Sequence, residues 1–376
     1  MTDESKRFIT RWDLDKTYLR TSFDSLSDLL NTALESVEDK RTVPGATAVL
    51  RELGEAGGTI HIVSGSPRQM RKRLTQKLEL DRVVFRELTL KPNLSNLLRL
   101  RFGALRDQLG YKLPELLEAH ARETRDAAGP ALPEVLVGDD SESDAFIYSL
   151  YADLCAGKID SSELSEVLRV GKVREHSARR CLRALQELKR ADNVAVILIH
   201  LDGQSPPSLF RPYGPRVVPF FNYLQAAFVL LERGFLSARQ VVAIAYDFHA
   251  HHGFTADVMA RSYADLYRRG HADGSAPARL LPALGGFHSP RVTEATSVST
   301  PSPSEASEEE APPLSLNSAL WEAVREMQQH TAPGPLLASN ASKDGPPKLE
   351  PKLDYRVLAE NHRGGQNRRK PGQRFR

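Results

Sequence analysis

FITRWDLDKT, at residues 8–17, is the stretch that decides the fold of this chain. Apart from Arg11, its first five residues are apolar or β-branched, which predicts a buried strand at Phe8–Trp12. Asp13 and Asp15 follow directly, and alternation along a strand points both carboxylates to the same side. Ligands of α/β sheets bind at the carboxyl ends of strands, where this pair is expected. Aspartates also favour turns for backbone reasons, so the pair has a structural alternative.

The composition is that of a globular protein with room for one large core. The 376 residues are 40% hydrophobic and carry a formal net charge of only +3, so bulk nucleic-acid binding is not expected. Two cysteines, Cys155 and Cys181, are too few for a disulfide framework and fit a reducing compartment. The opening residues are polar and no apolar run is long enough to span a bilayer, so we expect a cytoplasmic protein.

Strand-like runs alternate with helical spacing over the first 200 residues. The predicted strands are Phe8–Trp12, Thr59–Val63, Val83–Leu88, Val135–Val137 and Val194–Leu201. The spacing between them predicts helices at Leu26–Val37, Ala46–Leu53, Gln69–Leu78 and Leu113–Arg122. Strands that alternate with helices of this length form parallel β-α-β units. We therefore expect an α/β fold with a doubly wound parallel sheet.

The chain is expected to divide into three parts. Residues 1–201 form the sheet domain, with a helical insertion at about 155–190. Residues 202–288 have the spacing of a helical extension, with helices predicted at Phe221–Leu231, Ala238–His249 and Thr255–Tyr267. Residues 289–376 begin with a stretch rich in Ser, Thr, Pro and Glu, which predicts a mostly disordered tail. A short amphipathic piece, Leu314–Gln329, interrupts this tail.

A second polar signal follows the strand predicted at Thr59–Val63. Ser64 lies at the carboxyl end of this strand, level with Asp13, where its hydroxyl can hold a substrate oxyanion. Ser66 is followed by Pro67 and, three residues on, by Gln69. This spacing predicts that Ser66 caps the next helix.

A third signal is the acidic loop GDDSESD at residues 138–144. Its four acids would repel one another unless a cation or a ring of donors lies among them. Because Mg²⁺ prefers carboxylate oxygens and takes only one or two of them along with water and phosphate, the loop predicts a magnesium site. The alternative is a solvated acidic loop. Gly138 is expected to let the backbone turn tightly before Asp139.

A phosphate substrate also needs a cation from the protein. Lys112 is expected to open the helix that leads to the acidic loop. Lys91 is its competitor, because it directly follows a predicted strand. The position of Lys112 in the order of motifs favours it.

In their order along the chain, these motifs resemble those of the haloacid-dehalogenase-like hydrolase superfamily. That pattern has Asp-x-Asp-x-Thr after strand one, Ser or Thr after strand two, Lys at a helix start and Gly-Asp-x-x-x-x-Asp. The matching residues here are Asp13, Asp15, Thr17, Ser64, Lys112, Asp139 and Asp144. More narrowly, VSGSP at residues 63–67 with the acidic loop resembles the phosphatidate phosphatase catalytic-domain family. The resemblance covers roughly residues 7–201.

The resemblance implies a phosphomonoester hydrolase that depends on Mg²⁺ and works through an aspartyl-phosphate. Asp13 is then the nucleophile, Asp15 the proton carrier, and Ser64 and Lys112 the ligands of the phosphoryl oxygens.

The resemblance also implies a magnesium ion bound by Asp13, by the backbone carbonyl of Asp15 and by Asp139. Asp144 either orients Lys112 or completes the metal shell. The short intervals between motifs imply a minimal cap and so a large phosphorylated substrate, with phosphatidate as one option.

Other interpretations concern the rest of the chain. A non-catalytic module, in which the sheet domain is a scaffold, is the alternative function. The histidines His249, His251 and His252 are a candidate metal site, although a positively biased helix C-terminus is the simpler interpretation. The run Leu97–Phe102 and the basic residues 368–376 are candidates for peripheral contact with an anionic membrane, each with a solvated alternative. The oligomeric state is not predicted.

Overall fold

A computed structural model describes residues 7–19, 42–91, 105–125, 129–141, 143–285, 316–331 and 350–368. The predicted helix Leu26–Val37, the run Leu97–Phe102 and the basic residues after 368 lie outside these ranges. So does the Ser- and Pro-rich stretch that begins the predicted tail.

Six strands form one parallel sheet, in the order β3-β2-β1-β4-β5-β6. The strands are β1 (Phe8–Asp13), β2 (Gly58–Pro67), β3 (Glu87–Lys91), β4 (Glu134–Asp139), β5 (Val194–His200) and β6 (Val217–Phe220). The expected α/β fold with a doubly wound parallel sheet is thereby confirmed. The strand order reverses between β1 and β4, which makes this the switch point of the sheet.

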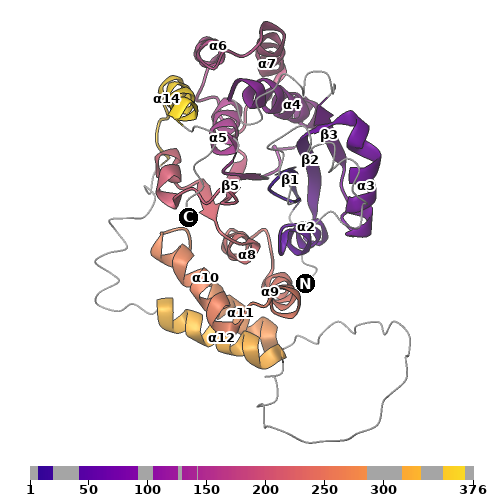
Figure 1. The fold of residues 1–376 in the computed structure, drawn as a ribbon, viewed down its shortest axis with the longest axis vertical. Helices are drawn as coiled ribbons and strands as arrows, with labels where there is room; N and C mark the ends of the chain where they lie inside the picture. The colour runs from indigo at the N-terminus through magenta and orange to yellow at the C-terminus, as the bar shows by residue number, and fades with distance from the viewer. Residues whose placement is uncertain are drawn as a thin grey trace, which may run out of the picture.

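Helices cover both faces of the sheet, as Figure 1 shows. One face carries α2 (Ala46–Glu55), α3 (Arg71–Leu80), α8 (Tyr223–Glu232) and α9 (Ala238–His252). The other carries α4 (Leu105–Arg125), α5 (Asp144–Cys155), α6 (Ser161–Val170) and α7 (Glu175–Glu187). Two 3₁₀ turns, η1 (Arg68–Met70) and η3 (Pro207–Tyr213), follow β2 and β5. The sheet thus separates two apolar cores.

Arg11 is the one basic residue of β1, and the α4 face accommodates it by pairing. Its guanidinium lies 2.8 Å from Glu134 and 2.5 Å from Glu123, and only 1% of Arg11 is exposed. Burial alone would raise the pKa of Glu134, but the charge of Arg11 and hydrogen bonds from His120 and Arg11 hold that pKa well below its usual value. The charge in a buried strand is therefore explained by a partner that β4 supplies.

The helical extension continues the core on the α2 side. Here α10 (Ala256–Arg268) and α11 (Ala276–Gly285) lie outside α8 and α9, and α12 (Leu316–Thr331) packs across α10 and α11 (Figure 1). The apolar face of α12, which includes Leu320 and Val324, belongs to this core. The amphipathic piece predicted at Leu314–Gln329 is thus a packed helix.

A last helix, α14 (Tyr355–Arg368), packs on the opposite core, beside α5 and α6 (Figure 1). Tyr355 is 2% exposed and donates a hydrogen bond of 2.6 Å to Asp153 on α5. Within the range predicted to be mostly disordered, the described residues therefore include two packed helices. Helix α12 belongs to one core and α14 to the other.

Three boundary predictions are wrong. The third strand begins at Glu87 rather than Val83, because Val83 and Val84 complete the turn after α3 and Val84 is 85% exposed. Helix α4 begins at Leu105, so Lys112 lies inside this helix instead of opening it. Strand β6 was not predicted and lies in the range assigned to the helical extension; its Pro219 is tolerated because β6 is an edge strand. No helix among the described residues is both long and apolar enough to cross a membrane.

Candidate active site

The candidate site lies at the switch point of the sheet, at the carboxyl ends of β1 and β4. After β1 the chain passes to the α2 face, and after β4 it passes to α5 on the other face. Adjacent parallel strands whose connections leave in opposite directions open a crevice at their carboxyl ends. Asp13 ends β1 and Asp139 ends β4, so the fold brings both to this crevice.

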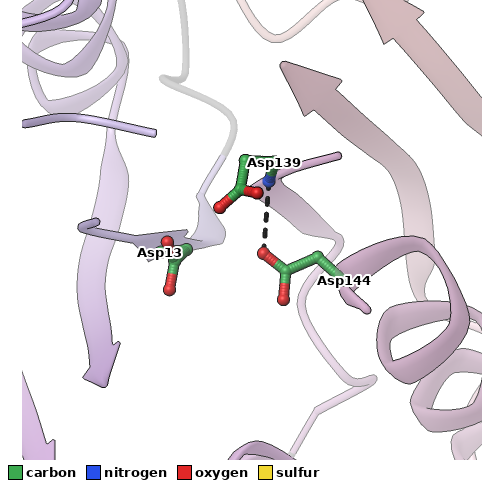
Figure 2. Close-up of side chains that lie close together, drawn as sticks. All are labelled: Asp13, Asp139 and Asp144. Atoms are coloured by element: carbon green, nitrogen blue, oxygen red, sulfur yellow. Dashed lines mark hydrogen bonds between the residues drawn. The ribbon is translucent and has the colours of Figure 1, made fainter. Parts of the chain in front are cut away.

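Three aspartates converge in the crevice. Asp13 comes from β1, Asp139 from β4 and Asp144 from the first residue of α5, as Figure 2 shows. One carboxylate oxygen from each lies within 4.8 Å of the others, and none of the three is more than 1% exposed. Among the described residues, this is the single group of three or more possible ligands placed closely enough to hold a metal ion.

Lys112 joins this cluster from α4. Its ammonium group lies 2.9 Å from Asp13 Oδ1 and 2.5 Å from Asp144 Oδ1, and the side chain is fully buried. With all three aspartates ionised, the cluster including Lys112 carries a net charge of −2. A divalent cation balances that charge, and carboxylate oxygens are donors of the kind that Mg²⁺ prefers. The residues present therefore fit a magnesium ion.

Gly138 allows the close approach of Asp144. A Cβ at Gly138 would lie 2.3 Å from Asp144 Oδ2 and 2.7 Å from its Cβ, which no real side chain permits. The same Asp144 oxygen accepts a hydrogen bond of 3.2 Å from the backbone N–H of Asp139 (Figure 2). Asp139 Oδ1 in turn accepts from the N–H of Ser141 at 2.5 Å. The loop is therefore ordered by backbone donors, which the sequence pattern alone does not show.

Asp140 points away from the cluster and anchors another loop. Its carboxylate accepts hydrogen bonds from the N–H groups of Gly203 and Ser205, at 2.6 and 2.8 Å. This aspartate thus ties the loop after β5 to the loop after β4, and it is not one of the clustered ligands.

Asp15 is held by two serine hydroxyls of β2. Ser64 Oγ donates to Asp15 Oδ2 at 2.8 Å, and Ser66 Oγ lies 3.2 Å from the same oxygen. The capping box predicted for Ser66 is wrong: the residue before η1 is Pro67, and no side chain caps that turn. The N–H of Ser66 donates instead to Ser64 Oγ at 2.9 Å. Both serines therefore orient the carboxylate of Asp15.

The turn that carries Asp15 is fixed from β5 and α8. Lys16 has a left-handed backbone, with a φ of 61°, and its carbonyl oxygen lies 3.2 Å from His200 Nδ1. Tyr223 donates a hydrogen bond of 2.7 Å to the carbonyl of Thr17. Thr17 Oγ1 donates to Asp13 Oδ2 at 3.3 Å. The two aspartates are thus held separately. Lys112 of α4 and Thr17 hold Asp13, whereas the serines of β2 hold Asp15.

Three buried tyrosines, Tyr111, Tyr148 and Tyr223, stand around the site. Burial is the main cause that raises their pKa values well above the usual range. A nearby acid raises each pKa further: Glu115 for Tyr111, Asp144 for Tyr148 and Asp13 for Tyr223. The phenols therefore stay neutral at physiological pH. An environment of this kind is poorly polarisable, so charges inside it interact more strongly than in water.

The site residues predicted from the sequence thus fall into two groups. Asp13, Lys112, Asp139 and Asp144 form one cluster, while Asp15 and Ser64 form a hydrogen-bonded pair beside it. Sequence reasoning missed Ser66 as a partner of Asp15, and it missed His200. His200 ends a strand at the same edge as Asp139, which was the one signal that could have identified it.

The histidines at the end of α9 do not form a metal site within the described residues. His249 Nδ1 lies 2.8 Å from the carbonyl of Phe254, whereas His251 and His252 both face Asp247. Gly253 ends the helix in the left-handed conformation. The arrangement is that of a helix C-terminus with basic side chains in its last turn.

Comparison with known proteins gives no match, whether with family models, curated proteins or solved structures. The interpretation of the site therefore depends on its geometry and on the order of its motifs.

Proposed function

We propose that this protein is a phosphomonoester hydrolase that depends on Mg²⁺ and forms an aspartyl-phosphate on Asp13. The observation that carries the proposal is the cluster of Asp13, Asp139 and Asp144, with Lys112 in contact with both Asp13 and Asp144, at the switch point of a parallel sheet. A neighbouring ammonium group favours the charged form of a carboxylate, and the charged form is the one that attacks phosphorus.

In the proposed reaction a carboxylate oxygen of Asp13 forms a bond to phosphorus while the bond to the leaving oxygen breaks. Lys112 offsets negative charge on the phosphoryl oxygens and holds Asp13 in place. When bound by Asp13, Asp139 and Asp144, Mg²⁺ would supply further positive charge to these oxygens. Release of the phosphate from Asp13 then requires attack by water.

Asp15 is proposed as the proton carrier. It gives its proton to the leaving oxygen and later takes one from the attacking water, which is ordinary general acid–base catalysis. The hydroxyls of Ser64 and Ser66 support this role because they fix the direction of the Asp15 carboxylate. Ser64 also lies near the carboxyl end of β2, where a hydroxyl can reach a phosphoryl oxygen.

The test is Mg²⁺-dependent phosphate release from four classes of monoester: phosphatidate in mixed micelles, a sugar phosphate, a nucleotide and a phosphopeptide. Asp13→Asn should abolish release, because the amide is a poor nucleophile. Asp257→Asn, an exposed change on α10, is the matched control and should behave as the wild type. No release from any class would favour the alternative of a non-catalytic scaffold.

The intermediate can be tested separately. Acid-quenched wild-type protein should carry a phosphoryl group that hydroxylamine removes, and Asp13→Asn should carry none. Phosphate release without such a group would contradict the role of Asp13 as the nucleophile.

A further inference from the structure

A second lysine reaches the site from the edge strand β3. The ladder between β2 and β3 is irregular, since Leu90 pairs with Ser64 but Lys91 pairs with Pro67. Strand β2 therefore bulges at Gly65 and Ser66, and such bulges often redirect side chains beside active sites. A Cβ at Gly65 would lie 3.7 Å from Lys91 Nζ and 3.9 Å from Asp15 Oδ2. Lys91 and Asp15 thus face the same small space above Gly65.

The ammonium group of Lys91 is held in this position. Only 6% of Lys91 is exposed, and its Nζ lies 5.2 Å from the ring centroid of Tyr111. Tyr111 is fixed in turn, because its hydroxyl donates to the carbonyl of Ser64 at 2.8 Å. Lys112, the next residue of α4, instead contacts Asp13 in the carboxylate cluster. Two adjacent residues of α4 therefore contribute to the two lysine positions: Tyr111 contacts Lys91, and Lys112 is the second lysine.

The surroundings of the site are polarised in charge. The segment after β2, residues 68–78, contains five basic residues and no acid: Arg68, Arg71, Lys72, Arg73 and Lys77. Arg68, Arg71 and Lys72 are exposed. On the opposite side, Asp139 ends β4, and the loops after β4 and β5 supply Asp140 and Asp202. A field of this kind draws the anionic part of a substrate towards the β2–β3 side.

We propose that the alcohol part of the substrate, which leaves during hydrolysis, carries a second anionic group that Lys91 binds. This inference rests on the proposed function, in which Asp13 and Asp15 act on opposite sides of the phosphorus. Attacking and leaving oxygens lie roughly in line. Lys112 belongs to the side of Asp13, whereas Lys91 lies beside Asp15 and so faces the leaving group. Lys91 is then a residue that determines specificity.

The experiment compares three substrates that differ mainly in the charge of the leaving group. They are 3-phosphoglycerate, with a carboxylate; glycerol 3-phosphate, which is neutral there; and phosphoethanolamine, which is cationic. The full chain is assayed with Mg²⁺ as wild type, as Lys91→Met and as Lys158→Met. The last variant is the matched control, because Lys158 follows the far end of α5, about 17 Å along that helix from Asp144.

For the wild type, kcat/KM should decrease from the anionic to the neutral to the cationic substrate. In Lys91→Met, the ratio of kcat/KM for 3-phosphoglycerate to that for glycerol 3-phosphate should fall by about 10-fold or more, as expected for the loss of a charged hydrogen bond. Lys158→Met should keep the wild-type ratio. The inhibition constant of glycerate, the product without phosphate, should rise in Lys91→Met alone.

Two results would overturn the inference. One is a wild-type enzyme that prefers the neutral substrate, or phosphatidate, whose leaving group carries no anion; this result does not depend on the folding of any variant. The other is an equal loss for all three substrates in Lys91→Met, which is what a purely structural lysine would give. Absence of turnover on every substrate would overturn the proposed function itself, whereas either of these two results overturns only this inference.

Discussion

Gly138→Ala should inactivate the protein without unfolding it. The new Cβ would overlap Asp144 Oδ2 at 2.3 Å, and moving this oxygen out to 3.4 Å, the lower bound of ordinary contact, takes a shift of about 1 Å. Such a shift stretches the 2.5 Å contact between Asp144 and Lys112 and the 3.2 Å hydrogen bond from the N–H of Asp139. Misplacement by about 1 Å at a reacting centre can cost about 100-fold in rate.

We therefore expect kcat/KM of Gly138→Ala to fall by about 100-fold in the Mg²⁺-dependent release assay. Overpacking in a dense region costs about 1–3 kcal/mol, so the free energy of unfolding in urea should fall by that amount while the fold persists. Gly129→Ala is the matched control, since a Cβ there meets no atom within 4 Å. Activity of Gly138→Ala within about threefold of the wild type would refute the reasoning, because the carboxylate cluster would then not need its observed geometry.

Three further predictions concern the support of the site and the stability of the fold. Arg11→Met should lower the free energy of unfolding in urea by about 3–5 kcal/mol, because it leaves Glu134 buried without its main partner; a loss below about 1 kcal/mol would contradict this. Ser66→Ala should lower kcat by about 10-fold with little change in melting temperature, as one of the two hydroxyls on Asp15 is lost; an unchanged kcat would exclude that role. Burial, and then the charges of nearby arginines, lower the pKa of His271 from 6.5 to about 3, so the unfolded chain binds the proton first as the pH falls. Neutral His271 therefore contributes its full stability above pH 6.5, and this contribution declines towards pH 3. In urea titrations the free energy of unfolding should fall less between pH 7 and 4.5 in His271→Gln than in the wild type, by up to about 2 kcal/mol.

The sequence predicted the sheet well where strands are central and apolar, as in β1, β4 and β5. It failed at the edges of the sheet. Strand β6 has only four residues and contains Pro219, and neither its length nor its composition gives a periodic signal. The start of α4 was missed because Gly110 and Pro114 indicate a break, whereas tertiary packing of the leucines on that helix outweighs local propensity.

The candidate site shows the same division. Order along the chain and position at strand ends were enough to nominate Asp13, Asp139 and Asp144, which the fold does bring together. The second hydroxyl on Asp15 could not be predicted, since Ser66 also satisfies the local pattern of a helix cap. Nor could the approach of Lys91, because it depends on a bulge in β2 that only strand pairing reveals.

The position of α14 has a consequence for synthesis of the protein. Tyr355 and Ala359 complete the core on the α4 face, yet they are translated more than 130 residues after β6, the last strand that contributes to that core. Domains generally fold as units while the chain emerges from the ribosome. Here the α4–α5–α6 face cannot be fully covered until α14 has emerged, and the hydrogen bond from Tyr355 to Asp153 cannot form before then. A message truncated after residue 290 would consequently yield a nascent protein with bare apolar surface on both sides of the sheet, a substrate for chaperones and proteases.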